Sequence, residues 1–387
     1  MAAEAGCRSS VPILQPDTAK RLFHTDEISI SRLERYAACP YQHFVDYGLR
    51  PVRQENFEYT DAEAGTFFHA ALERFIRAAG EEQEWPFIPD ERVDGIMDGI
   101  CAELTEEWNG GPLREDALGI WQGEEYLRRA HHAARVLTRF AGNSDFRTAA
   151  AEQAFGKPGG LPPLVLHLPD GSRAAVQGII DRIDLCRGRD GDWLRVVDYK
   201  SSGKKPEAAK MADGEQLQLM IYLQAASRAV PGARPAGAMF FPIQDTEVDI
   251  PDENPEAAEA ERLRKVRMKG IVLAREEVLQ AMDREIRPYS VDEVFKKDGT
   301  LKKSADWAVE EDVLKGLMDA AEGKAAEICA EIRAGRIEAA PRGTEDTSPC
   351  RYCSYRTLCR RRKDSFRPRD EGATYRDIAG KNTLREQ

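Results

Sequence analysis

Two acidic residues and a lysine occupy positions where buried strands are expected to converge. Asp181 lies in the apolar run GIIDRIDL, and Asp198 and Lys200 lie in VVDYKSS. Residues two apart on a strand point to the same face, so Asp198 and Lys200 project together. The turn-rich segment GRDGD between the two runs predicts a hairpin, which brings Asp181 close to them.

This combination suits the hydrolysis of phosphodiester bonds. Carboxylates from two strands offer hard oxygen ligands to Mg²⁺ or Mn²⁺, which polarises a phosphate and lowers the pKa of a bound water. A lysine beside the site can orient or deprotonate that water and offset the charge that builds on phosphorus. An isolated D-x-K is more often a strand ion pair, but the apolar residues on both sides of Asp198 argue against solvated charges here.

Four further residues bear on this site. Gln218 and Tyr222 are four apart on an expected helix and therefore share a face, where they can hold a DNA phosphate or the lysine. Glu152 is either another carboxylate near the metal or a surface glutamate. His69 lies beside apolar residues of a helix. A lone helix histidine is usually structural, and only the other candidate residues of this site make a metal role for His69 credible.

The cysteines indicate a second centre. Cys350, Cys353 and Cys359 form the pattern C-x₂-C-x₅-C, and Cys39, followed by a proline and an aromatic cluster, is the best fourth ligand. Four thiolates fit either Zn²⁺ or an iron-sulfur cluster, and spacing alone leaves both open. Since Cys39 and Cys350 are 311 positions apart, the centre would clamp the two ends of the domain together.

The composition excludes several classes of protein. Of 387 residues, 42% are hydrophobic and 32% are charged, as expected for a folded soluble chain. No apolar stretch approaches the roughly 20 residues of a membrane span, and the first residues lack a signal-peptide pattern, so we expect a cytoplasmic protein without membrane contact. The net charge of -11 means that binding to a nucleic acid requires a local basic track.

Periodicity predicts helices, then strands, then mixed elements, and hence an α/β fold around a mixed sheet. We expect residues 1–27 to be a leader or cut linker, 28–363 the main domain, and 364–387 a polar tail on the surface. A small hairpin is expected around Lys297, Asp298 and Gly299. Helices are predicted near 29–39, 62–79, 91–107, 121–141, 206–229, 273–286 and 309–334, and strands in 149–200 and 236–243.

Five segments in one order resemble a known family. They are SISRLERYAACPYQHFVDYGLRP, GTFFHAALERF, GIIDRIDL with VVDYKSS, QLQLMIY and CRYCSYRTLC. Together they resemble the C-terminal nuclease domain of AddB subunits of bacterial helicase-nucleases, in the RecB-like branch of the PD-(D/E)XK superfamily. The resemblance covers about residues 27–362, with Ile180-Asp181 in place of the Pro-Asp of the superfamily name.

The resemblance implies a PD-(D/E)XK nuclease fold, in which a central mixed sheet is flanked by helices, with helical extensions and an iron-sulfur staple joining the ends. In it Lys200 assists the water, and Gln218 with Tyr222 matches the Q-x₃-Y of the family. The metal ligands implied are His69, Asp181, Asp198 and the Tyr199 carbonyl. The ligands implied for a [4Fe-4S] cluster are Cys39, Cys350, Cys353 and Cys359.

The implied function is an Mg²⁺-dependent exonuclease domain that cuts single-stranded DNA supplied by an AddA-like helicase subunit, during double-strand-break processing for recombination. The chain has no GxxxxGK[ST] phosphate loop, so we expect an excised domain or a stand-alone relative. The alternatives are a stand-alone RecB-like nuclease of the CRISPR-adaptation type and a catalytically idle iron-sulfur scaffold that binds DNA. The intact D-x-K argues against the idle scaffold.

Overall fold

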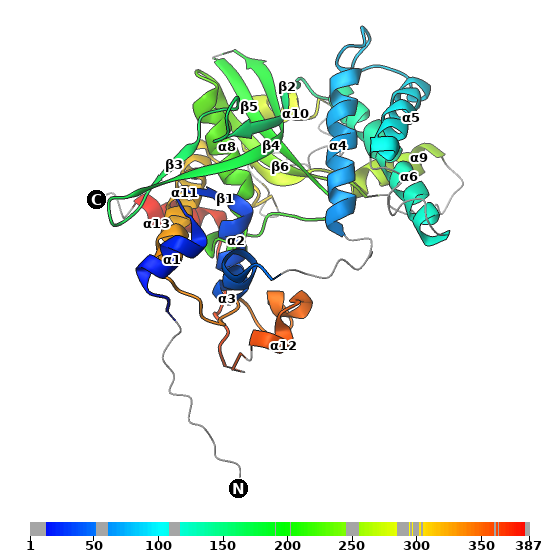
Figure 1. The fold of residues 1–387 in the computed structure, drawn as a ribbon. Helices are drawn as coiled ribbons and strands as arrows, with labels where there is room; N and C mark the ends of the chain where they lie inside the picture. Colours follow the sequence, from blue (N-terminus) through cyan, green and yellow to red (C-terminus); the bar gives the residue numbers. More distant parts are fainter. Residues whose placement is uncertain are drawn as a thin grey trace.

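The fold was analysed in a computed structural model (Figure 1). The structure describes residues 13–51, 61–107, 117–189, 191–201, 203–244, 255–284, 294, 296, 302, 305–359, 361–362 and 364–383. Within these residues a mixed sheet of eight strands forms the centre, and helices pack on both of its faces. This is the α/β architecture that the sequence predicted.

Strand β4 (Arg173–Gly188) organises the sheet because four other strands pair with it. Its first half pairs in parallel with β1 (Glu27–Ser29) and antiparallel with β3 (Leu164–His167). Its second half pairs antiparallel with β2 (Arg147–Phe155) and with β5 (Gly191–Lys200). The β4–β5 pair is the predicted hairpin, so the two acidic segments are neighbours.

The remaining strands extend the sheet beyond β5. Strand β6 (Arg234–Pro242) runs parallel to β5, β7 (Lys269–Leu273) antiparallel to β6, and β8 (Ala308–Val309) parallel to β7. A parallel pair requires a crossover, which here contains helices α7 (Ala208–Ala212) and α8 (Gln218–Ala229). This crossover places α8 beside β5 and β6.

Alternation along β5 sends its side chains to two helical layers. The Tyr199 ring lies 5.9 Å from that of Phe241, which lies 6.1 Å from Phe140 of α6 (Ala117–Gly142). Asp198, one residue earlier, faces α8. Figure 1 shows the two layers apart: α4 (Asp61–Ala79) and α5 (Asp90–Glu107) stand with α6, and α11 (Glu311–Arg333) lies with α8.

Both terminal segments contain elements that pack into the fold. The predicted leader holds α1 (Pro16–Phe23), whose Phe23 side chain is buried, and β1 begins at its last residue. Residues 364–387 include α13 (Tyr375–Thr383), which packs on α11. The expectation of a surface tail is therefore wrong for this helix, because its apolar residues form a short stripe that is buried: Tyr375, Ile378 and Ala379.

Most other predicted elements are present, with shifted bounds. The helix expected over 206–229 is split into α7 and α8 around Gly214, which has a φ of +85°. The helix expected over 273–286 is α10 (Glu276–Met282). Helix α9 (Pro255–Lys265) and strand β7 were not predicted. The hairpin expected around Lys297, Asp298 and Gly299 lies outside the described residues.

Short helices carry the cysteine segments. They are α2 (Ile30–Ala38), α3 (Pro40–His43), the π-helical turn η1 (Phe44–Leu49), the 3₁₀ turn η2 (Pro349–Tyr352) and α12 (Arg356–Cys359). Pro40 separates α2 from α3, as the sequence predicted. In the described part of the chain, none of the helices has the length and apolar character needed to span a membrane.

The docking of α13 generates a prediction about stability. Replacing Ile378, 7% exposed, by Ala should lower the free energy of unfolding by about 2–4 kcal/mol, because a buried apolar side chain is lost. Chemical denaturation measures the change, and Glu371→Ala, at an exposed position just before α13, is the control and should alter stability by less than about 0.5 kcal/mol. Equal stability of the two variants would mean that α13 is undocked in solution.

Candidate active site and cysteine centre

The end of β5 carries a buried acid paired with a lysine. Asp198 is 0% exposed, and its Oδ2 forms an ion pair with the Nζ of Lys200, which keeps about a fifth of its side chain exposed. The predicted projection of these two residues to one side of the strand is thus confirmed. An ionised carboxylate at this depth requires such a partner, since burial without one strongly disfavours the charge.

Asp181 reaches the same place from the neighbouring strand. Arg182 of β4 pairs with Val197 of β5, so Asp181 lies across from Asp198. Its Oδ2 accepts a hydrogen bond from the backbone N–H of Tyr199 at 2.6 Å, and its side chain is almost fully buried. The hairpin register therefore brings the two carboxylates together, as the sequence predicted.

His69 of α4 closes the site from the other side. Its Nε2 lies 3.0 Å from the Tyr199 carbonyl oxygen, and its Nδ1 lies 3.4 Å from Asp181 Oδ2. Burial alone would lower the pKa of His69, but the carboxylates of Asp181 and Glu152 beside the ring outweigh burial and raise the pKa to about 10. Without a metal the imidazole is consequently protonated at neutral pH and donates from both nitrogens.

Glu152 is part of the site, although the sequence left its role open. The ligand atoms of His69, Glu152 and Asp181 lie within 4.8 Å of one another. Glu152 Oε1 is buried without a hydrogen-bond donor among the described residues, and it lies 3.7 Å from His69 Nδ1. The residue has a φ of +48° and lies between the pairs Ala151–Arg182 and Gln153–Ile180 of β2 and β4, which brings it close to Asp181.

Gln218 and Tyr222 share one face of α8, as predicted, but their contacts differ from those expected. The Gln218 amide donates to Asp198 Oδ1 at 2.6 Å and to the Tyr222 hydroxyl at 3.2 Å. Gln218 thus fixes the orientation of the Asp198 carboxylate rather than holding the lysine, and Tyr222 supports Gln218. The expected contact with a DNA phosphate stays a prediction.

The charges at this site are strongly coupled. Burial and the neighbouring Asp181 carboxylate raise the pKa of Asp198 to about 7, against the opposing effects of Lys200 and His69. Several carboxylate oxygens, a backbone carbonyl and one imidazole form a donor set that fits Mg²⁺ or Mn²⁺. The orphaned Glu152 oxygen is the observation that most directly favours a cation here.

The four predicted cysteine ligands meet at one place. Cys39, Cys350, Cys353 and Cys359 all line one small cavity of about 20 Å³. Burial raises the pKa of the Cys39 thiol to about 11, so a thiolate at this position requires a cation. Four thiolates around one cavity fit either zinc or an iron-sulfur cluster.

Backbone contacts hold the two cysteine segments together. The Arg342 N–H donates to the Ala38 carbonyl at 2.9 Å, and Arg367 donates to the carbonyls of Ala37 and Ala340 at 2.5 and 2.7 Å. The far end of the chain is thus tied directly to the last turn of α2, next to Cys39. The two segments that the cysteine centre is expected to clamp are therefore also joined by hydrogen bonds, and the metal clamp itself stays a prediction.

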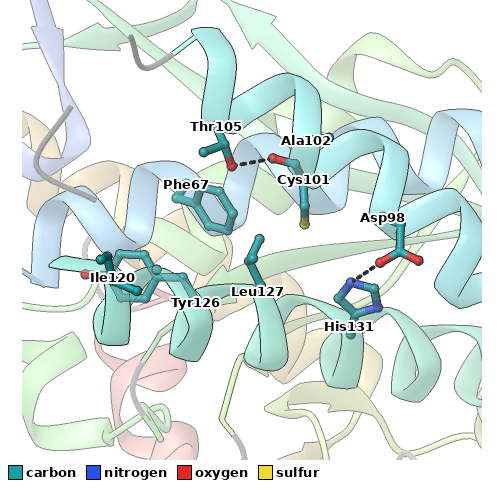
Figure 2. Close-up of a pocket in the computed structure, with 10 residues that line it drawn as sticks. Phe67, Asp98, Cys101, Ala102, Thr105, Ile120, Tyr126, Leu127 and His131 are labelled. Carbon is teal, nitrogen blue, oxygen red and sulfur yellow. Dashed lines mark hydrogen bonds and ion pairs between the residues drawn. The ribbon is translucent and has the colours of Figure 1, made fainter. Parts of the chain in front are cut away.

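A larger cavity lies elsewhere, among the helices α4, α5 and α6. It has a volume of about 530 Å³ and is lined by Phe67, Cys101, Tyr126 and Leu127 among others (Figure 2). At its edge, Nε2 of His131 on α6 lies 3.3 Å from Oδ1 of Asp98 on α5. The cavity does not include any of the strand-end carboxylates or Lys200, so it is separate from the candidate active site.

Comparison with known proteins agrees with this geometry. Residues 27–360 match the family model of the PD-(D/E)XK nuclease superfamily. The AddB subunit of the ATP-dependent helicase/deoxyribonuclease of Moorella thermoacetica is 33% identical over 385 residues, which cover 96% of this chain and 33% of that protein. The corresponding subunit of Desulforudis audaxviator is 31% identical over 379 residues, covering 95% and 32%.

A third such subunit, from Alkaliphilus oremlandii, is 29% identical over 344 residues and covers 87% of this chain and 30% of its own length. The chain therefore spans about a third of the length of these relatives. The family model, by contrast, matches most of the chain and includes every residue of the strand-end site. This chain belongs to the PD-(D/E)XK nuclease superfamily.

Proposed function

We propose that this chain is a metal-dependent deoxyribonuclease domain that hydrolyses phosphodiester bonds of single-stranded DNA as an exonuclease. One observation carries the proposal: two strand carboxylates, a helix imidazole and a lysine converge at one end of the sheet. Membership of a nuclease superfamily supports the same chemistry.

The residues that would hold Mg²⁺ or Mn²⁺ are His69, Asp181, Asp198 and the Tyr199 carbonyl oxygen, with Glu152 as a further candidate. When bound, such a cation polarises a phosphate oxygen and makes a water more acidic. Because Tyr199 would bind the cation through its backbone carbonyl, its side chain can pack in the core. The ring is almost fully buried against Phe241.

Lys200 and Gln218 act on the reacting groups and on Asp198, respectively. The partly exposed Lys200 ammonium can hold the attacking water or a phosphate oxygen, and its charge offsets the negative charge that grows as the phosphorus–oxygen bond breaks. Gln218 holds Asp198 Oδ1, which leaves Oδ2 directed toward Lys200. The carboxylate is therefore fixed before substrate arrives.

The cysteine centre is proposed to hold a [4Fe-4S] cluster on Cys39, Cys350, Cys353 and Cys359. The meeting of the four cysteines at one cavity supports a metal centre, and the resemblance to AddB nuclease domains favours the cluster over zinc. The role of the centre is structural, because it fastens the C-terminal segment to α2 beside the backbone contacts already described.

The similar proteins suggest the setting in which the domain works. Each is named as one subunit of an ATP-dependent helicase/deoxyribonuclease. We propose that this chain likewise works with an AddA-like helicase subunit, which unwinds DNA ends and supplies a single strand, during repair of double-strand breaks by recombination in the cytoplasm. The absence of a phosphate loop from the sequence means that ATP hydrolysis must come from another segment or another protein.

Replacing Asp198 by Asn should abolish metal-dependent degradation of single-stranded DNA, with a rate loss of at least about a thousandfold, because the amide keeps the volume but not the charge. The measurement uses end-labelled single strands with and without Mg²⁺, and circular dichroism verifies folding. Asp192→Asn, at the exposed start of the same strand, is the matched control and should retain activity.

Two outcomes of this assay would change the proposal. Wild-type protein that is inert with every divalent metal and every form of DNA would favour the idle scaffold. Degradation of intact double-stranded DNA by the chain alone, without ATP or a helicase partner, would favour the stand-alone nuclease.

Metal binding should weaken as the pH falls. In the metal-free protein the pKa of Asp198 is raised to about 7 and that of His69 to about 10, so a cation must displace protons from both. Lowering the pH from about 8 to about 6 should reduce the affinity for Mn²⁺ in titration calorimetry, and binding should release protons. In Asp198→Asn the step near neutral pH should disappear. An affinity independent of pH would show that these groups are not ligands.

Removing one cysteine ligand should disrupt the second centre. Cys39→Ser should lose metal and show a lower melting temperature, because the clamp between the ends of the domain opens. Metal analysis and visible absorbance of anaerobically purified protein measure the content, with Cys101→Ser, away from the centre, as the control. A colourless, zinc-loaded wild type would contradict the cluster, and unchanged metal in Cys39→Ser would place the fourth ligand elsewhere.

A further inference from the structure

Helix α8 begins without a capping side chain of its own. Its N-cap position is Leu217, which has no side-chain hydrogen bond to the helix. Glu34 of α2 takes this role, since its Oε1 accepts the backbone N–H of Leu217 at 2.7 Å and of Gln218 at 3.0 Å. These two N–H groups are among the donors that the start of a helix leaves without a partner in the helix. A carboxylate also interacts favourably with the positive end of the helix dipole.

Gln218, which Glu34 caps, also fixes the carboxylate of Asp198. Gln218, whose N–H Glu34 accepts, donates from its side chain to Asp198 Oδ1 at 2.6 Å. Gln218 thus connects two carboxylates: its backbone N–H bonds Glu34, and its side-chain amide bonds Asp198. If the first turn of α8 frays, the amide of Gln218 moves and Oδ1 of Asp198 loses this donor.

Glu34 is also close to the cysteine centre along its own helix. Cys39 follows α2, and its N–H still bonds the Arg35 carbonyl. Five residues of helix correspond to about 7.5 Å along the axis. Arg367 and Arg342 hold the last turn of α2 through the carbonyls of Ala37 and Ala38. Helix α2 is therefore a short, fixed link between the cysteine centre and the start of α8.

We propose that Glu34 is a positioning residue of the active site. It caps α8 from α2, holds Gln218 against Asp198, and makes the orientation of the catalytic carboxylate depend on the cysteine centre at the other end of α2. Glu34 contacts Leu217 and Gln218 and acts on Asp198 only through them. The kinetic test of this inference rests on the proposed nuclease function. The tests by Mn²⁺ binding and by hydrogen exchange do not.

The first test compares three variants of Glu34 in the full chain. Glu34→Gln keeps an acceptor oxygen at the same reach, Glu34→Asp keeps the charge but is one methylene shorter, and Glu34→Ala removes both. We expect the Asp and Ala variants to lower kcat on single-stranded DNA about tenfold or more, with KM within about threefold, and the Gln variant to stay near wild type. Glu27→Ala, exposed on β1, is the matched control.

Two patterns would overturn the proposal. If the variants lower the melting temperature but leave kcat unchanged, Glu34 is a stabilising cap with no effect on the catalytic acid. If Glu34→Gln is as impaired as Glu34→Ala, the negative charge matters and the hydrogen-bond geometry does not.

Binding and exchange readouts separate this inference from the proposed function. Hydrogen exchange should be faster at the amides of Leu217 and Gln218 in Glu34→Ala, and Mn²⁺ affinity should fall about fivefold or more, with both restored in Glu34→Gln. These results would stand even if the wild type cut no DNA, which would defeat the proposed function alone. Unchanged Mn²⁺ affinity in Glu34→Ala would overturn the positioning role.

The link to the cysteine centre has its own test. Cys39→Ser should weaken Mn²⁺ binding in the wild-type background and weaken it much less in Glu34→Ala, because the connection is already cut. If Cys39→Ser does not fold, removal of metal from the cysteine centre by a chelator, followed by Mn²⁺ titration of both proteins, gives the same comparison. Equal, additive effects in the two backgrounds would overturn the proposed dependence.

Discussion

One fully buried carboxyl group needs the surrounding donors and charges to balance the cost of its burial. Asp198 has no exposed surface, and isolated burial would neutralise it. Three neighbours stabilise its ionised form: Lys200, Gln218 and His69. Lys200 lies on the same strand, Gln218 on the crossover helix α8, and His69 on α4 in the opposite helical layer. The sheet, α8 and α4 must all be in place before the site exists, so the fold is a condition of the chemistry.

Local rules predicted the parts of the site that local geometry determines. Alternation along a strand put Asp198 and Lys200 on one side, and helical spacing put Gln218 and Tyr222 on one face; both are confirmed. The hairpin followed from two apolar runs around a turn. The target of Gln218 could not be predicted, because it depends on how far α8 sits along β5, which tertiary packing decides.

The two acids of GIIDRIDL illustrate the same limit. Asp181 and Asp184 are three apart, so a strand sends them to opposite faces. Asp184 lies between Arg182 and Arg195, with Oδ atoms at 3.0 and 2.8 Å from their Nε atoms, and despite its burial these two arginines lower its pKa. It is a structural ion network within the sheet. The expected hairpin already pointed to Asp181 as the partner of Asp198. The contacts of Glu152, Glu34 and the packed helices α1 and α13, by contrast, depend on distant segments.

The distance in sequence between groups that meet in the fold sets the order in which the two sites are completed during synthesis. His69 meets the carbonyl of a residue 130 positions later, and Cys39 awaits partners that begin 311 positions later. At typical translation rates that interval lasts on the order of half a minute. A ribosome-bound chain therefore contains His69 and Cys39 before the residues that they meet in the fold have been synthesised.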